Sequence, residues 1–423
     1  MSNFNVIAMS ARVLVKVLQG VALETALARY RDIEVHPQIS HSCFEAMRHY
    51  FSLSERLQAV VNRPLERLDS EVLCVLLAAA SQIEHSRTPI HAVVSTAVEA
   101  ARKVGKSSAS GLVNAALRKY SPDEPLHSTQ ALTELPNWFI ESIEHHYSAQ
   151  KTSLVEALNS RAPLTLRVNS SRISVRKYCD LLEDAEIAFR SSKVSNAFTL
   201  EQPRPMTTIP GYSKGYFAVQ DLSSQLAVPL LNPRCGDRVL DACAAPGIKT
   251  AQIHDLFQDC EVDSVDVKNE CSTWNIAPDS PFHWGVEIRK GDLGTTSWWN
   301  GLPYQRILLD VPCSGTGTIR RHPDIKVTRT PDQISKLAAL QLRFLKTTWK
   351  TLESNGRLVY CTCSILPEEN DEVIRGFVEQ CPDARVESVE LAYGFPTSCG
   401  RQILPTVDGG DGFYFSCLRK FEA

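Results

Sequence analysis

Two cysteines, fifty residues apart, offer the clearest chemistry in this sequence. Cys313 ends the motif Asp-Val-Pro-Cys, and Cys363 lies between Thr362 and Ser364. Each follows an apolar run that predicts a β-strand. A thiol becomes a strong carbon nucleophile when neighbouring cations lower its pKa. One such cysteine would most often fill a core, but two of them favour nucleophilic catalysis. The candidate cations are Lys249, Arg320 and Arg321.

A third cysteine, Cys361, raises the question of a metal site. The spacing Cys361-Thr-Cys363 is too short for the usual zinc knuckle. The chain has no Cys-x-x-Cys pair and no His-Glu-x-x-His motif, so we expect no metal site. Strand alternation puts both cysteines on one face. Only position separates them: Cys363 stands at the strand's end, whereas Cys361 suits buried filler.

Acidic residues close three of the predicted strands, at Asp241, Asp266 and Asp310. The loop 241–250 joins a strand to a helix through small residues and a Pro-Gly turn, which lets the backbone approach a ligand closely. It is neither a G-x-G-x-x-G fingerprint nor a P-loop, and a plain tight turn explains it about equally well. Asp266 stands where an acid can accept the hydroxyls of a ribose.

The elements that must position these residues begin near residue 226. From there strands alternate with helices, a pattern that predicts a doubly wound parallel sheet. Such sheets bind ligands at the carboxyl ends of their strands. Upstream, residues 1–130 carry apolar residues at helical spacing, and residues 131–225 mix a linker, helix and strand-like pieces. We therefore expect an all-helical domain over 1–130, a small α+β module over 131–225 and an α/β domain over 226–423.

Composition narrows the class of protein further. The 423 residues are 43% hydrophobic and 22% charged, as in ordinary globular proteins. Thirteen cysteines without regular spacing favour a reduced cytoplasmic setting over a disulfide framework. The N-terminus lacks a basic start, and Arg12 and Lys16 interrupt its apolar residues, so we expect no signal peptide. The run Val72–Ala80 is too short to span a membrane.

The net charge of −3 hides three basic clusters. Each could be an ordinary solvated face, but three in one chain favour a polyanionic partner. The clusters lie within Arg102–Lys119, Arg161–Lys177 and Ile319–Arg329.

Four segments together resemble a known family: DACAAPGIKT (241–250), LLDVPCSGTGTIRRHPDIK (308–326), YCTCSILPEEN (360–370) and DGFYF (411–415). They are similar to the signature blocks of the RNA cytosine-C5 methyltransferases, specifically the bacterial small-subunit (16S) ribosomal RNA methyltransferase B group of the Sun/Fmu type. That group carries an N-terminal domain similar to the antitermination factor NusB. The resemblance implies a Rossmann-like class I methyltransferase domain, preceded by a small α+β module and an all-α NusB-like RNA-binding domain.

The resemblance also implies a role for each matching residue. Cys363 would be the nucleophile, Cys313 would assist release of the product, and Asp310 would lie between cofactor and base. Asp266 would bind the ribose of S-adenosylmethionine, and Asp292 would lie near the adenine. The loop residues that would bind the cofactor are Cys243, Ala244, Ala245, Pro246, Gly247, Ile248 and Lys249.

The implied reaction suits these residues. Cytosine C5 is too weak a nucleophile to take a methyl group, but a thiolate that adds at C6 makes C5 enamine-like. A carboxyl such as Asp310 near N3 could stabilise the developing charge. The base must be unpaired or flipped out, and basic side chains would hold the RNA backbone. We expect small-subunit ribosomal RNA as the partner, a monomer, no membrane and no metal.

Two alternatives stay open. The same chemistry could act on transfer RNA or on another ribosomal cytosine. The chain could instead be an RNA-binding, antitermination-like factor with a decayed cofactor site. Ile248, where the family usually has glycine, and the altered segment after Asp266 motivate the second alternative. A β-branched residue costs about 1–2 kcal/mol where φ must be positive.

Overall fold

The computed structural model describes residues 5–267 and 287–422, which fall into two compact units. The first comprises residues 1–159 and 319–330, and the second comprises residues 160–318 and 331–423. Most of the altered segment after Asp266 lies outside the described residues. Among the described helices, none is long and apolar enough to cross a bilayer.

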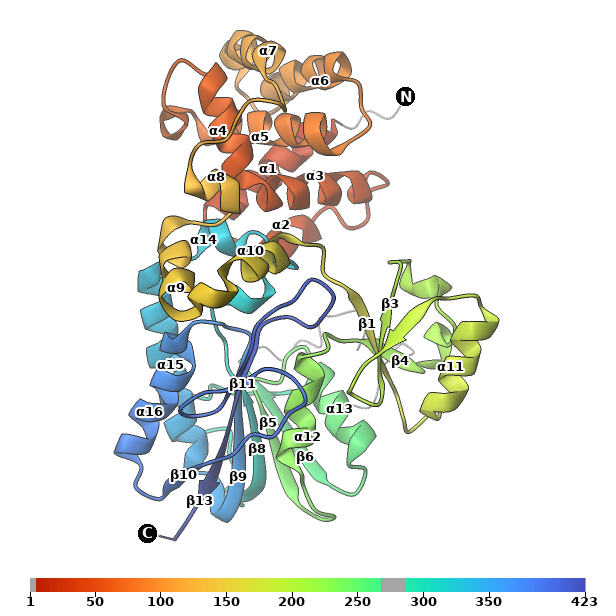
Figure 1. Cartoon of the computed structure of the whole chain (residues 1–423), viewed down its shortest axis with the longest axis vertical. Coiled ribbons are helices and arrows are strands. Elements are labelled where there is room, and N and C mark those ends of the chain that lie inside the picture. The colour runs from red at the N-terminus through yellow and green to blue at the C-terminus, as the bar shows by residue number, and fades with distance from the viewer. Residues whose placement is uncertain (1–4, 268–286, 423) are drawn as a thin grey trace. The chain divides into compact units, whose positions relative to one another are not determined.

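The first unit is entirely helical (Figure 1). Its central helix, α5 (Ser70–His85), is buried from Cys74 to Ser81 and packs against α1, α3, α4, α6 and α7. This confirms the all-helical N-terminal domain, and the unit continues to Asn159 through three helices beyond residue 128. Its other helices are α1 (Val6–Leu18), α2 (Leu23–Ala28), α3 (His36–Arg48), α4 (Tyr50–Val60), α6 (Ile90–Lys103), α7 (Ser110–Lys119), α8 (Thr129–Thr133), α9 (Asn137–Tyr147), α10 (Lys151–Asn159) and α14 (Ile325–Thr328).

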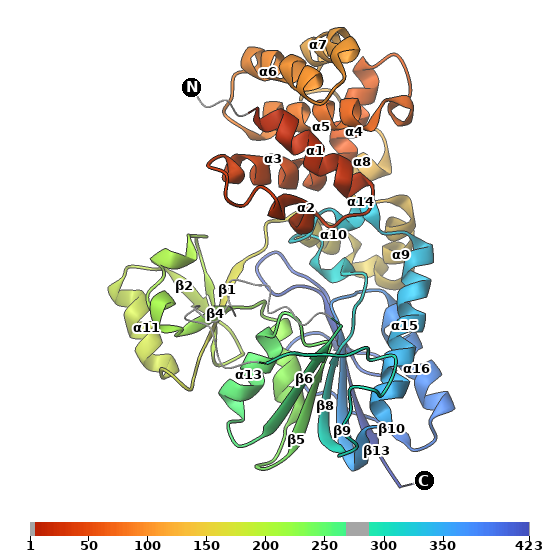
Figure 2. The same ribbon diagram turned by 180° about the vertical axis from the view of Figure 1, so that it is seen from behind.

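A small antiparallel sheet with one helix opens the second unit. Its strand order is β2-β3-β1-β4, and α11 (Val175–Asp184) packs on it through Tyr178 and Leu182 (Figure 2). This is the predicted α+β module. Its strands are β1 (Leu164–Val168), β2 (Phe189–Ser191), β3 (Ala197–Leu200) and β4 (Phe217–Val219).

The larger sheet has the order β11-β12-β13-β9-β8-β5-β6-β7, and β10 pairs with β13. Strands β5 to β9 run parallel, as predicted for a Rossmann-like domain, whereas β13 runs antiparallel to β9. The predicted parallel sheet is therefore a mixed one. An antiparallel neighbour needs no crossover helix. The strands are β5 (Arg238–Ala242), β6 (Glu261–Asp266), β7 (Arg289–Lys290), β8 (Tyr304–Asp310), β9 (Leu352–Thr362), β10 (Ala384–Glu387), β11 (Phe395–Pro396), β12 (Arg401–Ile403) and β13 (Phe413–Lys420).

Helices cover both faces of this sheet, because alternate strand residues point to opposite sides. On one face, Leu240 and Leu309 pack against α15 and α16. On the other face, Val239 and Leu308 pack against α12 and α13 (Figure 1). Strand β9 contains an irregularity at Asn355-Gly356, where Asn355 adopts φ +63°. The helices are α12 (Ala227–Leu231), α13 (Ile248–Leu256), α15 (Pro331–Trp349) and α16 (Asp371–Gln380).

Candidate active site

The two cysteines meet at the carboxyl edge of the larger sheet. Strands β8 and β9 are parallel neighbours, so the residues that follow them lie side by side. The sulfur atoms of Cys313 and Cys363 are 3.3 Å apart. The two loops are also joined through their backbones, because the Gly317 N–H donates to the Cys363 carbonyl at 2.9 Å. The geometry thus brings together two thiols that the sequence separates by fifty residues.

A third segment, which contains the DGFYF motif, closes against the Cys313 loop. The Gly412 N–H donates to the Gly317 carbonyl at 2.9 Å. A Cβ atom at Gly317 would lie 2.4 Å from the Gly412 carbonyl oxygen, so only glycine permits this approach. The contact explains why two glycine-containing motifs, distant in sequence, belong to one site.

The cysteine thiols differ in their surroundings. The pKa of Cys313 is raised well above its ordinary value by its hydrogen bond with Cys363 and by burial. Cys361 is fully buried, and its sulfur donates to Asp310 Oδ1 at 3.4 Å. Burial and the Asp310 charge raise the pKa of Cys361. Cys361 is therefore more than apolar filler, since it hydrogen bonds to a predicted site residue.

Lys249 is the one predicted cation that the structure places among these groups. Its Nζ donates to Asp310 Oδ2 at 2.5 Å. Burial lowers the pKa of Lys249, but the Asp310 carboxylate outweighs burial and holds it above its ordinary value. Arg320 and Arg321 belong to the segment that packs with the helical unit. The proposed thiol activation by those two arginines thus gains no support.

The loop that joins β5 to α13 has the backbone expected of a ligand cradle. Cys243 and Gly247 adopt φ values of +61° and +95°. Gly247 thus supplies the left-handed residue, and α13 begins at Ile248 with negative φ. The strain anticipated at Ile248 is absent. The Ala245 N–H donates to Asp266 Oδ2 at 3.1 Å, which ties the loop to the end of β6.

Asp266 and Asp292 lie at the ends of neighbouring parallel strands. The Gly291 N–H donates to the Asp266 carbonyl at 2.8 Å, which brings the two strand ends together. Asp266 is buried, whereas Asp292 is exposed and lies 3.9 Å from Arg343. Carboxylates at this edge suit the hydroxyl groups of a ribose.

Asp241 adds a further polar group at the base of the loop. It is fully buried, and its Oδ2 accepts a 2.5 Å hydrogen bond from Thr250. Its Oδ1 has no hydrogen-bond partner among the described residues. Burial raises the pKa of Asp241 to about 7. Small loop residues, left-handed turns and three strand-end carboxyls together fit a ribose-bearing cofactor.

Of the three basic clusters, only the first has no buried basic residue. Its arginines and Lys119 are exposed. In the second cluster, Arg167 is fully buried and forms a 2.7 Å ion pair with Asp255. In the third, Arg320 and Lys326 are buried. The expectation that these three side chains face a polyanion is therefore wrong.

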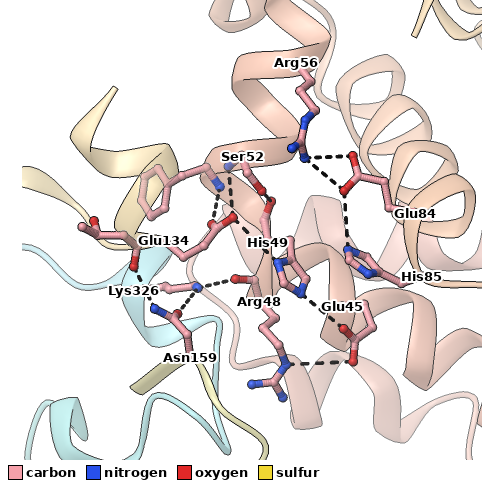
Figure 3. Close-up of polar contacts among 12 residues, drawn as sticks. Glu45, Arg48, His49, Ser52, Arg56, Glu84, His85, Glu134, Asn159 and Lys326 are labelled. Carbon is pink, nitrogen blue, oxygen red and sulfur yellow. Dashed lines mark hydrogen bonds and ion pairs between the residues drawn. The ribbon is translucent and has the colours of Figure 1, made fainter. Parts of the chain in front are cut away.

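Lys326 belongs to a polar cluster of the helical unit (Figure 3). Its Nζ donates to the Arg48 carbonyl and to Asn159 Oδ1. Glu45, His49 and His85 in this cluster have ligand atoms within 4.8 Å of one another. However, the two imidazole rings stack at an interplanar angle of 22°, so their in-plane lone pairs do not converge on one ion. We assign no metal to this cluster.

Two residues of the LPEEN motif, to which the sequence pattern assigns no role, lie next to the candidate cysteines. Glu369 and Asn370 are buried, and they hydrogen bond to Ser314 and Thr362, the neighbours of Cys313 and Cys363. A carboxyl and an amide directly after an apolar strand and turn were the available signal. Their partners depend on tertiary contacts that spacing does not reveal.

Comparison with known proteins gives matches along nearly the whole chain. Family models described as "16S rRNA methyltransferase RsmB/F", "Methyltr_RsmF/B-like, ferredoxin-like domain" and "NusB family" match residues 228–419, 135–207 and 8–122. Ribosomal RNA small subunit methyltransferase B of Vibrio cholerae is 36% identical over 432 residues, which cover 98% of each chain. The Citrobacter koseri protein of that name is 36% identical over 387 residues, 89% of each chain.

A solved structure shares the fold. The crystal structure of PH0851 covers 98% of this chain and 99% of its own, with a TM-score of 0.81 and 20% sequence identity. Together with the family models, this confirms the predicted order of an all-α domain, an α+β module and a Rossmann-like domain.

Proposed function

The chain belongs to the ribosomal RNA small subunit methyltransferase B family, and from this premise we propose that it methylates C5 of a cytosine in 16S ribosomal RNA through a covalent Cys363–C6 adduct. The family relationship makes the chain a methyltransferase that uses S-adenosylmethionine. The choice of cytosine, the C5 position and the roles of individual cysteines are parts of the proposal.

The cofactor would be held by the loop 243–249 together with the strand-end carboxyls. Asp266 would accept the ribose hydroxyls, Asp292 would lie near the adenine, and Lys249 would keep Asp310 in place. The small side chains of this loop allow its backbone to approach the ligand. When bound, S-adenosylmethionine supplies an electrophilic methyl group.

The protein's own residues would carry the remaining steps. The Cys363 thiol gives its proton, through solvent, to N3 of an extruded cytosine as its sulfur adds to C6. The Asp310 carboxylate accepts a hydrogen bond from that N3–H, which favours the protonated base. After C5 is methylated it gives its proton to water, the sulfur–C6 bond breaks, its electrons return to Cys363, and N3 gives back its proton. Cys313 keeps its proton at neutral pH, so it can donate a hydrogen bond to the departing thiolate.

One observation carries the proposal: two thiols lie 3.3 Å apart at the end of neighbouring parallel strands, beside a carboxyl that pairs with a lysine. Cysteines that only fill a core need no polar groups around them. A nucleophile and a second thiol for its release require this proximity.

The first test measures transfer of labelled methyl groups to 16S ribosomal RNA. Cys363→Ala is expected to lower the rate at least about a thousand-fold, because it removes the nucleophile. Cys417→Ala is the matched control, because Cys417 is a buried cysteine of β13 that packs in the apolar core, and it should retain transfer. Equal transfer by wild type and Cys363→Ala would contradict the proposal.

A second test separates the proposed roles of Cys313 and Cys363. Cys313→Ala should form the covalent adduct but release it slowly, so a protein–RNA band should persist on a denaturing gel. The double variant Cys313→Ala/Cys363→Ala should show no such band. A missing band for Cys313→Ala, or a band for the double variant, would contradict the assigned roles.

One of the two reasons for the alternative of a decayed cofactor site no longer holds, because Ile248 begins a helix without strain. The other reason, the altered segment after Asp266, concerns residues that lie mostly outside the described part of the chain. Calorimetric titration with S-adenosylmethionine distinguishes the two functions, because a non-catalytic factor would give no binding heat. Bisulfite mapping of RNA from cells with and without the protein would identify the cytosine and test transfer RNA as substrate.

A further inference from the structure

The Cys313 loop is held from behind by a buried carboxylate. Glu369 is fully buried; its Oε1 accepts from the Ser314 N–H at 2.8 Å and its Oε2 accepts from the Ser314 hydroxyl at 2.5 Å. Gln341 donates to Glu369 Oε1 and to the Pro312 carbonyl, both at 3.0 Å. The two neighbours of Cys313 are thus held by hydrogen bonds, Ser314 by Glu369 and Pro312 by Gln341.

The Cys363 loop is held in the same manner by Asn370, the residue that follows Glu369. Asn370 is 2% exposed, and its Oδ1 accepts from the Thr362 hydroxyl at 2.6 Å. Its Nδ2 donates to the Ser364 carbonyl at 3.0 Å and to Gln402 Oε1 at 2.9 Å. Both neighbours of Cys363 are therefore fixed by one amide.

We propose that Glu369 and Asn370 are positioning residues that together set the distance between the sulfurs of Cys313 and Cys363. Glu369 and Asn370 are consecutive in the chain. One peptide bond therefore links the residue that holds the Cys313 loop to the residue that holds the Cys363 loop. Their effect on methyl transfer rests on the proposed function. Their effect on the sulfur–sulfur distance does not.

The chemistry of Glu369 favours a positioning role over a purely stabilising one. A fully buried carboxylate is costly unless it is paired. The hydrogen-bond donors to the Glu369 carboxylate among the described residues are neutral groups of Ser314 and Gln341. A hydrophobic residue could fill this space without that cost. A hydrophobic residue could not, however, accept hydrogen bonds from the N–H and the hydroxyl of Ser314 and so fix their directions.

Two substitutions at Glu369 separate its hydrogen bonds from its charge. Glu369→Gln keeps an acceptor for the Ser314 N–H and for Gln341, and its amide can donate to the Ser314 hydroxyl. Glu369→Ala removes every one of these bonds. Glu369→Gln should therefore restore most of what Glu369→Ala loses.

The first measurement is the steady-state kinetics of methyl transfer. A displacement of about 1 Å at a reacting group costs about a hundred-fold in rate. We expect Glu369→Ala to lower kcat about a hundred-fold and Asn370→Ala about ten-fold or more, with KM for RNA within about two-fold of wild type. Glu369→Gln should stay within about five-fold of wild type.

The second measurement reads the sulfur–sulfur distance without RNA or cofactor. Oxidised glutathione converts the two thiols into a disulfide: each thiol loses a proton, the sulfur–sulfur bond forms, and the oxidant is reduced to two glutathione molecules. The rate of the Cys313–Cys363 linkage, followed by peptide mass spectrometry, should fall at least about ten-fold in Glu369→Ala and Asn370→Ala. Glu369→Gln should pair its thiols at nearly the wild-type rate.

Glu368→Ala is the matched control, because Glu368 is the adjacent acid and is exposed. It should match wild type in both measurements. Wild-type rates of thiol pairing in folded Glu369→Ala and Asn370→Ala would overturn the proposal, whatever the methyl-transfer result. Failure of Glu369→Gln to exceed Glu369→Ala would also overturn it. If wild type transfers no methyl group, the proposed function fails, while thiol pairing still decides the positioning role.

Discussion

Each unit of the molecule shields a lysine from most of the solvent, Lys326 fully and Lys249 in part, and the two lysines behave in opposite ways. In the second unit, Lys249 pairs with the Asp310 carboxylate, which holds the pKa of the lysine above its ordinary value. In the helical unit, Lys326 is 2% exposed, and burial lowers its pKa to about 7. Neither residue type nor burial explains this difference.

The difference lies in the partners. Lys326 donates to neutral oxygens, those of the Arg48 carbonyl and the Asn159 amide, while Glu134 contributes only through its charge at a distance (Figure 3). Neutral acceptors satisfy the hydrogen bonds of an ammonium group without neutralising its charge. The site of the second unit therefore keeps a permanent cation beside its carboxyl, whereas the helical unit holds a lysine that can lose its charge near neutral pH.

Substitution of Lys249 should lower stability throughout the neutral pH range, because it removes one partner of a partly buried ion pair. Such a loss costs about 3–5 kcal/mol, and the partial exposure of Asp310 lowers the expectation to about 2–3 kcal/mol. We expect this loss in the free energy of unfolding of Lys249→Met, measured by denaturant unfolding of the full chain. Methyl transfer should fall with it.

A double-mutant cycle shows whether the ion pair causes this loss. Lys249→Met/Asp310→Asn should be more stable than the sum of the single substitutions predicts, by about 1 kcal/mol or more. Lys336→Met, at an exposed lysine of α15, is the control and should change little. Additive losses would mean that Lys249 and Asp310 act independently.

Substitution of Lys326 should change the pH dependence of stability. Between the folded pKa of about 7 and the ordinary value of 10.5, the unfolded chain binds one more proton than the folded chain. The stability of wild type relative to Lys326→Met should therefore rise with pH across this window, by up to about 1.4 kcal/mol per pH unit. Thermal or denaturant unfolding from pH 7 to 9, with exposed Lys119→Met as the control, measures this slope. A flat difference would show that Lys326 keeps its charge.

Lys249 and Lys326 also show which parts of the structure could be predicted from the sequence. Lys249 was expected at the site as a candidate cation and, through the family resemblance, as a cofactor-binding residue; the structure pairs it with the strand-end residue Asp310. Parallel strands bring their carboxyl ends to one edge. Local pattern was therefore sufficient to place Cys363 and the aspartates Asp241, Asp266 and Asp310 at strand ends of an α/β sheet, whereas their expected roles come from the family resemblance.

The rest depended on contacts between residues far apart in the chain. Arg167 was assigned to a surface cluster, but its partner Asp255 lies 88 residues away. Lys326 finds its acceptors 278 and 167 residues upstream. Charged residues are almost never fully buried unless paired, so a surface assignment is the reasonable one when the partner is unknown. Glu369 escaped notice for the same reason.

Asp241 shows the opposite dependence on pH to Lys326. It is a buried acid, and burial raises its pKa from 3.8 to about 7. Between these values the folded chain binds one more proton than the unfolded chain, so stability falls as pH rises. Relative to Asp241→Asn, which keeps an acceptor for Thr250, wild type should lose up to about 1.4 kcal/mol per pH unit from pH 4 to 7.

The two slopes have opposite signs but occupy neighbouring pH windows, so they do not cancel. Lys326 favours alkaline pH above 7, and Asp241 favours acid below 7, so together they place a minimum of stability near neutrality. In Lys326→Met/Asp241→Asn this minimum should flatten, while the exposed pair Lys119→Met/Glu368→Gln should preserve it. A minimum that survives in the first double variant would assign the pH dependence to other groups. Its loss would show that Lys326 and Asp241, two buried groups whose hydrogen bonds among the described residues go only to neutral partners, set the response of this protein to pH.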